Sequence, residues 1–209
     1  MHTITKGLSK MNKILRKLKE VGILNLIIGI IKIPYFKLLQ KFFHFESWHI
    51  SPYELREYVQ IVAKYVNSHN AKYVVDIGCG LGELIRHINA PKRIGIDIEK
   101  ENINTAKYLH RRTNIEFKNG SFDDLGTKQE IDYLITLNFM HGSPHQTWQP
   151  AYHKICKNNN IKHIIVDSTK PDDNSYFHDF SLILPSEYKK CDQFGPLLGG
   201  RYIWVYEKE

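Results

Sequence analysis

Residues 74–83 read Val74-Val75-Asp76-Ile77-Gly78-Cys79-Gly80-Leu81-Gly82-Glu83. Branched apolar residues that carry a single acid are typical of a buried strand, and glycines then recur at alternate positions. Such glycines let the backbone turn tightly and approach a ligand without interference from Cβ atoms, beside the positive end of a following helix. The stretch therefore predicts a strand, a glycine turn that cradles a small molecule, and a helix from Gly82.

The segments that follow the turn supply further candidate ligand-binding groups. The spacing Gly-x-Gly-x-Gly differs from the Gly-x-Gly-x-x-Gly of dinucleotide-binding dehydrogenases. A second strand, Arg93–Ile98, carries Asp97 near its end, where a carboxylate can accept hydrogen bonds from ribose hydroxyls. Asp97 could instead cap the next helix, and Glu99 or Asn102 could compete for either task. After a third strand, Ser121 and Phe122 offer a hydroxyl and a ring that suit adenine.

Strand and helix patterns alternate over the rest of the chain. This alternation predicts an α/β fold, with a parallel sheet wound on both faces and a terminal antiparallel pair. The predicted strands are Tyr73–Ile77, Arg93–Ile98, Asn114–Phe117, Tyr133–Leu137, Ile161–Val166, Tyr188–Asp192 and Arg201–Tyr206, the last two joined by the turn Gly195–Gly200. The predicted helices include one from Lys100 to His110 and two that begin at Ser-Pro pairs.

The Ser-Pro pairs resemble helix N-termini. Ser51 can cap, Pro52 suits the first helical position, and Glu54 completes a capping box. Ser143, followed by Pro144 and Gln146, predicts a second start of the same kind. Both pairs therefore predict that a helix begins at the serine.

Composition limits the class of protein. The 209 residues contain no apolar run of 18, and 42% are hydrophobic and 12% aromatic, which favours one soluble-sized folded domain and excludes general disorder. The three cysteines, Cys79, Cys156 and Cys191, lack CxxC spacing, so we expect free thiols in a reducing compartment.

The positive charge is concentrated at the N-terminus. Lys and Arg exceed Asp and Glu by 29 to 22, and residues 1–50 hold nine of these bases and two of the acids. The remaining residues balance at 20 against 20. A neutral body lacks the broad basic face of an enzyme that follows nucleic-acid phosphates, so nucleic acid is an unlikely partner.

Residues 1–45 form a basic, apolar leader, and residues 46–209 form the predicted main domain. Leu8, Met11, Leu15 and Leu18 recur at helical spacing between basic residues. The apolar run Val21–Ile31 that follows is too short to span about 30 Å of hydrocarbon. The leader could lie in a membrane interface through residues 8–43, cap the active site, or pack on the body of the protein or on a partner.

The glycine motif Val74–Gly82 and the second-strand acid Asp97 resemble class I S-adenosylmethionine-dependent methyltransferases. The resemblance covers about residues 72–206. It implies a Rossmann-like, seven-stranded sheet with helices on both faces behind a helical N-terminal extension. It also implies S-adenosyl-L-methionine as cofactor and S-adenosyl-L-homocysteine as product. The cofactor-binding residues that it implies are Asp76, Gly78, Cys79, Gly80, Gly82, Asp97, Ile98, Ser121, Phe122 and Asn138.

The sequence departs from that family's motifs at two places, and these departures limit which acceptors the enzyme is expected to methylate. Ser121 stands where many relatives carry Asp for the adenine amino group. Asn138-Phe139-Met140-His141 replaces the Asn-Pro-Pro-Tyr type of motif found in amino-group and base methyltransferases. Methylation of adenine in DNA is therefore disfavoured.

The segment Trp48–Tyr58 resembles the leading segment of small methyltransferases from bacterial capsule and lipopolysaccharide gene clusters. The resemblance implies that Trp48, His49, Tyr53 and Arg56 lie over the crevice as substrate-binding residues. Arg56 could pair there with a carboxylate or phosphate. The alternative is an ordinary amphipathic helix.

His141 and His145 follow the fourth predicted strand, beside the carboxyl ends of the strands. Imidazole titrates near neutral pH, so either residue is a candidate catalytic base for an acceptor proton. We expect no metal, since Asn138 stands where metal-dependent relatives have an acid. Asp167 remains at the fifth-strand end, and Asp172, Asp173 and His178 lie in a polar stretch.

The sequence thus predicts methyl transfer to an oxygen or nitrogen of a small-molecule or saccharide-linked acceptor, such as a surface-polysaccharide precursor or a phosphoramidate group. An RNA methyltransferase that uses the basic leader and a noncatalytic cofactor-binding module are the alternatives. The expected location is cytoplasmic, at the inner face of the membrane.

Overall fold

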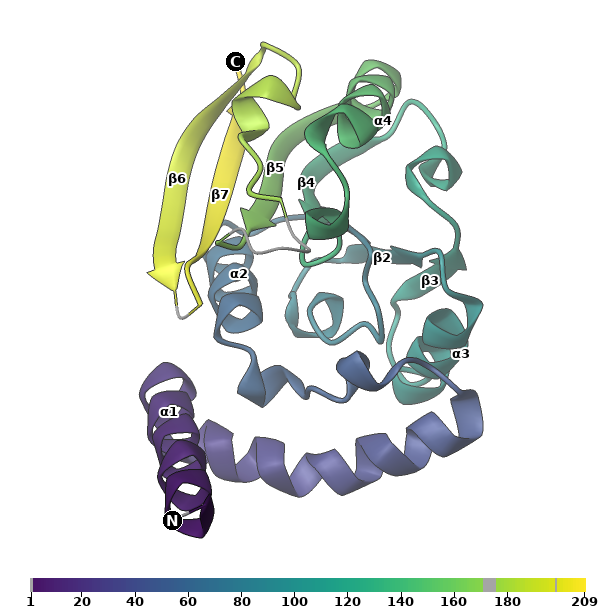
Figure 1. Cartoon of the computed structure of the whole chain (residues 1–209). Helices are drawn as coiled ribbons and strands as arrows, with labels where there is room; N and C mark the ends of the chain where they lie inside the picture. The colour runs from purple at the N-terminus through teal and green to yellow at the C-terminus, as the bar shows by residue number, and fades with distance from the viewer. Residues whose placement is uncertain (1, 171–175, 198) are drawn as a thin grey trace. The chain divides into compact units, whose positions relative to one another are not determined.

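The chain divides into two compact units, Met1–Ile61 and Val62–Glu209. The computed structural model describes residues 2–170, 176–197 and 199–209 (Figure 1), including the side chains of residue 12 and, within these ranges, of residue 14 onward. The predicted domain boundary after residue 45 falls inside the first unit.

The first unit is dominated by the helix α1 (His2–Phe43), which is bent at Gly22. Gly22 has φ 78° and ψ 163°, which are not helical values, so the helix kinks there and a second helical segment starts at Ile23. Two 3₁₀ turns follow, η1 (Ser47–His49) and η2 (Tyr53–Leu55), and α2 (Glu57–Ser68) begins in this unit.

The helix start predicted at Ser51 is wrong. Pro52 precedes η2 without a side-chain cap, and α2 begins only at Glu57. Glu54 is not available for a capping box because its carboxylate forms an ion pair with Lys32 of α1. A long-range partner within the unit thus takes the acid that the local pattern assigned to the helix N-terminus.

The helical part of the leader is longer than the apolar run Val21–Ile31 suggests. By length and composition alone, the 30-residue stretch Ile14–Phe43 could cross a membrane, and it is mostly exposed. The run of 11 residues therefore underestimates the length of the apolar helix, and its contact with a membrane stays a prediction.

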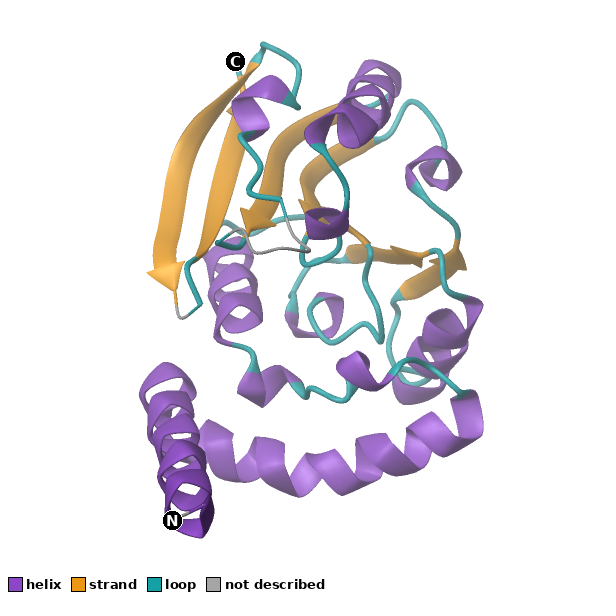
Figure 2. Cartoon of the chain, in the orientation of Figure 1, coloured by secondary structure: helices purple, strands orange, loops and turns teal. Residues whose placement is uncertain are grey.

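The second unit contains one sheet, whose strands are orange in Figure 2. Its strand order is β3-β2-β1-β4-β5-β7-β6. The first five strands run parallel, and β7 pairs antiparallel with both β5 and β6. This order confirms the predicted seven-stranded sheet. The strands are β1 (Tyr73–Ile77), β2 (Lys92–Asp97), β3 (Glu116–Asn119), β4 (Glu130–Thr136), β5 (Asn160–Ser168), β6 (Tyr188–Leu197) and β7 (Arg201–Lys208).

Helices cover both faces of this sheet. On one face, α4 (His145–Asn158) contributes Tyr152 and Ile155 to the main apolar cluster. On the other face, Tyr65 of α2 meets the ring of Tyr133 edge-on at 6.3 Å. The remaining elements are α3 (Lys100–Leu109) and the single 3₁₀ turns η3 (Ile85–His87), η4 (Phe122–Leu125), η5 (Met140–Gly142) and η6 (Phe180–Leu182).

Two further helix predictions need correction. The helix predicted from Gly82 is reduced to the turn η3, because Gly82 has a left-handed φ of 77° and the chain is already extended at Ile88. The helix predicted from Ser143 does form as α4, but it begins at His145 after Pro144 without a side-chain cap.

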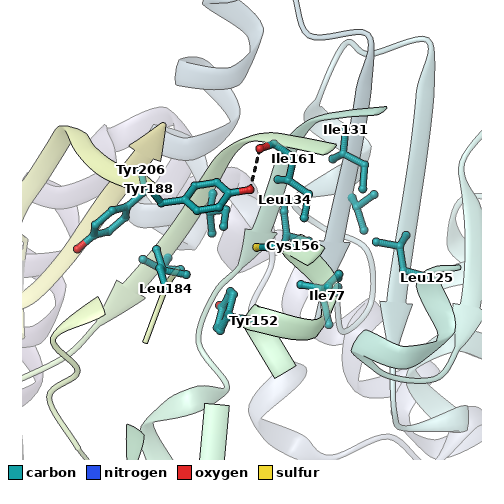
Figure 3. Packing of buried hydrophobic residues seen from close by; sticks show 14 of the residues in the cluster. Ile77, Leu125, Ile131, Leu134, Tyr152, Cys156, Ile161, Leu184, Tyr188 and Tyr206 are labelled. Atoms are coloured by element: carbon teal, nitrogen blue, oxygen red, sulfur yellow. Dashed lines mark hydrogen bonds between the residues drawn. The ribbon is translucent and has the colours of Figure 1, made fainter. Parts of the chain in front are cut away.

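The core lies between the sheet and α4 (Figure 3). Register places Val75, Leu134 and Ile164 side by side on three neighbouring strands, and all three are completely buried. Near the start of β5, the Tyr188 hydroxyl donates a hydrogen bond to the carbonyl oxygen of Ile161 (2.8 Å). The polar atom of this buried side chain is therefore hydrogen-bonded within the core. This packing fixes the ends of β1, β4 and β5 relative to one another.

Candidate active site

The glycine turn after β1 has the backbone conformation that its sequence predicts. Gly78, Gly80 and Gly82 have φ values of 76°, 53° and 77°, a region that other residues enter only with strain. The amides of Gly78 and Cys79 both donate to the carbonyl oxygen of Ile96, at 2.8 and 3.0 Å. The turn is therefore held over the end of β2 by its own backbone.

Neighbouring side chains pack directly against the glycines. A Cβ atom at Gly82 would lie 2.7 Å from the ring of Phe117, and one at Gly78 would overlap the ring of Phe139. Cys79 turns inward and is buried, and this burial raises the pKa of its thiol well above the usual value. Cys79 thus offers a ligand only its backbone, and the buried Asp76 lies in the strand itself.

Asp97 connects the ends of β1 and β2. Its Oδ2 accepts from the amide of Gly80 (2.7 Å), and its Oδ1 accepts from the amide of Glu99 (2.9 Å) and the side chain of Asn102 (3.1 Å). A carboxylate has about four lone-pair sites, so these three donors leave about one. The structure shows Asp97 bound to the start of α3 with an acceptor site left over, and its role at the ribose stays a prediction.

The surroundings of the turn fit an adenosyl compound. The glycines expose backbone without Cβ atoms, and Asp97 keeps an acceptor site for a ribose hydroxyl. Ile98, the next residue, is 72% exposed and offers an apolar surface of the kind that covers an adenine ring. A helix N-terminus is not part of this cradle, since η3 is a single turn.

The side chains of Ser121 and Phe122 both contact other residues of the protein. The Ser121 hydroxyl accepts from the amide of Asp123, and the Ser121 amide donates to Asp124 (2.8 Å), which together cap η4. The ring of Phe122 lies edge-on to that of Tyr152, at 5.2 Å. Their adenine-binding role stays a prediction.

A charged cluster lies where β4 and β5 end. Asn138 adopts a left-handed φ of 64°, and its amide donates to Asp167 Oδ1 (2.8 Å). Arg201, the first residue of β7, forms an ion pair with Asp167 and donates from Nη2 to Asn138 Oδ1 (2.6 Å). Asp167 is only 1% exposed, so this pairing compensates an otherwise costly buried charge.

His141 lies beside this cluster. Its Nε2 is 3.9 Å from Asp167 Oδ1, and neither ring nitrogen has a hydrogen-bond partner among the described residues. Burial, helped by the positive charge of Arg201 and by His178, lowers the pKa of His141 from 6.5 to about 4. His141 is therefore a neutral imidazole at physiological pH, with a lone pair available to take a proton.

His178 and Tyr176 hold the loop that carries His141. The His178 ring nitrogen Nε2 donates to the carbonyl oxygen of Met140 (2.9 Å), and the Tyr176 amide donates to the carbonyl oxygen of His141 (2.8 Å). His178 is thus a support of the loop in this structure. His145, the other candidate base, is half-buried in the first turn of α4.

The four predicted substrate-binding residues lie in the first unit. Trp48 is 55% exposed and stacks on His49 at 3.6 Å between ring centroids. Burial, with a further contribution from the charge of Arg56, lowers the pKa of His49 to about 4. Burial raises the pKa of Tyr53, and the buried Nε of Arg56 has no hydrogen-bond partner among the described residues. Their role over the crevice stays a prediction.

Within the part of the chain that the structure describes, no three His, Cys, Asp or Glu side chains gather as a metal site would require. Asp172 and Asp173 lie outside the described residues. Asp167, considered in the sequence as a remaining acid, is engaged by Arg201.

Phe139 and Arg201 belong to the site but were not predicted from the sequence. Phe139 had a weak signal, as a large aromatic residue two positions after the predicted strand Tyr133–Leu137. Arg201 had none in the local pattern, because only the antiparallel register of β7 on β5 brings it to the carboxyl end of β5.

A family model described as "Methyltransferase domain" matches residues 68–181, more than half of the chain. No curated protein sequence matches the chain significantly. Among solved structures, the chain is similar to a magnesium protoporphyrin IX methyltransferase from Synechocystis PCC 6803 with bound S-adenosylhomocysteine. The TM-score is 0.64 and the identity 14%, over 88% of this chain and 99% of that one.

Two further similar structures carry other activities in their names. The N-methyltransferase NodS from Bradyrhizobium japonicum WM9 has a TM-score of 0.63 and 15% identity, over 82% of this chain and 97% of that one. An rRNA methylase from Escherichia coli has a TM-score of 0.54 and 16% identity, over 74% of this chain and 65% of that one. At such identities the structures show a common fold. With the family match, the chain belongs to the methyltransferase-domain family and is a methyltransferase that uses S-adenosylmethionine.

Proposed function

We propose that this methyltransferase acts on an oxygen, or a nitrogen, of a small-molecule or saccharide-linked acceptor, such as a surface-polysaccharide precursor or a phosphoramidate group. One observation carries the proposal. His141 is a half-buried, neutral imidazole with two ring nitrogens that have no hydrogen-bond partner among the described residues, beside Asp167. His141 is partly exposed, with 15% of its side chain accessible, and it follows β4, the strand next to β1. The neighbouring Phe139 packs on Gly78 of the glycine turn.

The cluster around His141 suits the removal of a proton from an acceptor. Bound S-adenosylmethionine supplies an electrophilic methyl group, and a hydroxyl acceptor gains from losing its proton as the new bond forms. A ring nitrogen of His141 takes that proton, and the Asp167 carboxylate lies 3.9 Å from Nε2 of the imidazolium that forms. Arg201 holds Asp167 in place. An amine acceptor needs only to be neutral, so its methylation in the same site would depend less on proton removal by His141.

The resemblance of Trp48–Tyr58 to polysaccharide-cluster methyltransferases supports a saccharide-linked acceptor. In the first unit, the exposed Trp48 presents an indole face of the kind that covers the apolar face of a sugar ring. Arg56 suits an anionic group on such an acceptor. Trp48, His49, Tyr53 and Arg56 are therefore the proposed substrate-binding residues.

The test combines cofactor binding with a survey of acceptors. The full chain should bind S-adenosylhomocysteine in calorimetry and transfer a methyl group to nucleotide sugars or polysaccharide precursors, as detected by mass spectrometry of the product. RNA and peptides serve as comparison acceptors. No binding of either cofactor form at millimolar concentration would remove the enzyme assignment, and binding without transfer to any acceptor would favour a noncatalytic module.

Asp97→Asn should weaken S-adenosylhomocysteine binding by roughly 10- to 100-fold, because a charge-assisted hydrogen bond to ribose is lost and the Gly80 amide loses its carboxylate. Calorimetry measures the change, with thermal unfolding as a check on folding. Glu101→Gln is the matched control, since Glu101 is an exposed acid in the first turn of α3 and the variant should bind normally. Equal affinity of Asp97→Asn and wild type would exclude Asp97 from the cofactor site.

RNA methylation is the second candidate function, and the nine bases among residues 1–50 favour it. RNA held by this leader should bind with an affinity that falls steeply as salt rises. Removal of residues 1–45 should then abolish the binding. A chain that binds RNA weakly, with little dependence on the leader, rejects this candidate.

We also place the enzyme in the cytoplasm, at the inner face of the membrane. Cys79, Cys156 and Cys191 are all free thiols, as expected in a reducing compartment. The exposed apolar helix Ile14–Phe43 supports a location at a lipid surface.

A further inference from the structure

The second segment of α1, Ile23–Phe43, is apolar on two opposite faces. At 1.5 Å per residue this segment is about 31 Å long. One face is used within the first unit. Gly29 lies directly against Leu55, and Phe36 and Leu39 are buried.

Polar residues of the same inner face are paired with the segment that follows α1. The side chain of Asn25 donates to Gln60 of α2 (3.1 Å), and Lys32 forms an ion pair with Glu54 of η2. Glu54 is itself buried. These pairs join the inner face of α1 to the η2–α2 segment, so the helix is part of a folded unit along its length.

The outer face carries large apolar side chains in contact with solvent. Leu24, Ile31 and Phe42 are 68%, 70% and 70% exposed. The full outer face has spacings of three or four residues and consists of Leu24, Ile27, Ile31, Tyr35, Leu38 and Phe42. A continuous apolar face of this length marks a docking surface in a soluble chain.

The charges near the outer face have one sign. Lys37 and Lys41 are exposed within the segment, and Arg16 and Lys19 are exposed before the bend at Gly22. The one acid among residues 12–43, Glu20, is paired with Lys17 at 2.6 Å. An apolar face with exposed bases beside it complements a bilayer surface that contains anionic headgroups.

We infer that the outer face of Ile23–Phe43 lies in the plane of an anionic lipid leaflet and holds the enzyme to the membrane as a monotopic anchor. The inference rests on the proposed inner-membrane location and specifies how the chain attaches. A spanning helix would carry Lys32, Glu54 and their segment into hydrocarbon or break their pairing, and both are costly. A second copy on this face would bring Lys37 and Lys41 toward lysines of the same kind.

The test is co-sedimentation of the full chain with vesicles of phosphatidylcholine alone and with vesicles that also contain phosphatidylglycerol. Wild type should bind the anionic vesicles more tightly. Ile31→Glu/Leu38→Glu should lower binding to both by at least about tenfold. Lys37→Gln/Lys41→Gln should lower binding to the anionic vesicles by about tenfold and leave the neutral ones unchanged.

The matched control is Leu182→Glu/Tyr108→Glu, which adds the same charge at two residues of the second unit that are 57% and 43% exposed. It should bind vesicles as wild type does. All variants should keep their affinity for S-adenosylhomocysteine, which separates a failed anchor from a failed enzyme assignment. Unchanged vesicle binding of Ile31→Glu/Leu38→Glu would overturn the inference.

Depth and oligomeric state decide between the lipid leaflet and other environments. In a Cys191→Ser background, a fluorophore is attached to Leu24→Cys, Ile31→Cys or Phe42→Cys. Lipids brominated at a shallow depth should quench the fluorophore equally at all three positions. Quenching deepest at position 31 would indicate a spanning helix. A lipid-free dimer that Ile31→Glu/Leu38→Glu converts to monomer would assign the face to a second copy. Either result would overturn the inference.

Discussion

His141→Gln should lower kcat by about 100- to 10,000-fold and leave S-adenosylhomocysteine affinity unchanged, because it removes the base while keeping the loop that carries it. Methyl transfer to a hydroxyl acceptor under single-turnover conditions measures the effect. His145→Gln is the matched control and should retain most activity, since the structure gives Asp167 as a partner to His141 alone of the two candidate bases. Full activity of the His141→Gln enzyme from pH 6 to 9 would show that His141 is not the catalytic base.

The pH dependence of kcat provides a second check on His141. Its pKa is lowered to about 4, mainly by burial and then by the charge of Arg201, so the imidazole is neutral above that pH. The part of kcat that depends on His141 should therefore persist as pH falls through 6.5 and be lost only near pH 4. Arg201→Gln removes one cause of the lowering, so the acid limb should move upward, toward 6.5.

Asp167→Asn should lower the free energy of unfolding by about 3–5 kcal/mol, because it leaves the Arg201 guanidinium, which is largely buried, without its carboxylate. Chemical denaturation with a constant m-value measures the loss. The matched control is Asp123→Asn, since Asp123 pairs with Lys154 at the surface, where both side chains are more than 60% exposed. That change should cost under about 1 kcal/mol.

A double-mutant cycle completes the test of the ion pair. Asp167→Asn/Arg201→Gln should lose less stability than the sum of the two single variants, because the double variant leaves no uncompensated charge. Strictly additive losses would show that the ion pair does not couple the two residues.

The strands and the glycine turn could be predicted because local pattern determines them. Alternation of apolar runs with helical segments gave all seven strands, and glycines at alternate positions gave the left-handed turn that the structure contains. The position of Asp97 at the end of β2 could be predicted in the same way, and its role at the ribose stays a prediction. These predictions depend on residues close together in sequence, where steric and hydrogen-bonding preferences act directly.

The errors came from partners far apart in sequence. The capping box at Ser51 failed because Lys32, 22 residues before Glu54, takes that carboxylate. The charged cluster around Asp167 could not be predicted because it needs the register of β5 on β7, which joins Asn138 and Arg201 across 63 residues. A single sequence contains no signal for such register.

The antiparallel placement of β7 has a consequence for biosynthesis. Arg201 begins β7, so the cation that pairs with Asp167 leaves the ribosome after the strands β1 to β6 have been made. Until β7 emerges, the nascent sheet holds the Asp167 carboxylate beside His141 without that cation. A fragment that ends before β7 would present the glycine turn and lack this electrostatic balance, which couples catalytic competence to the synthesis of β7.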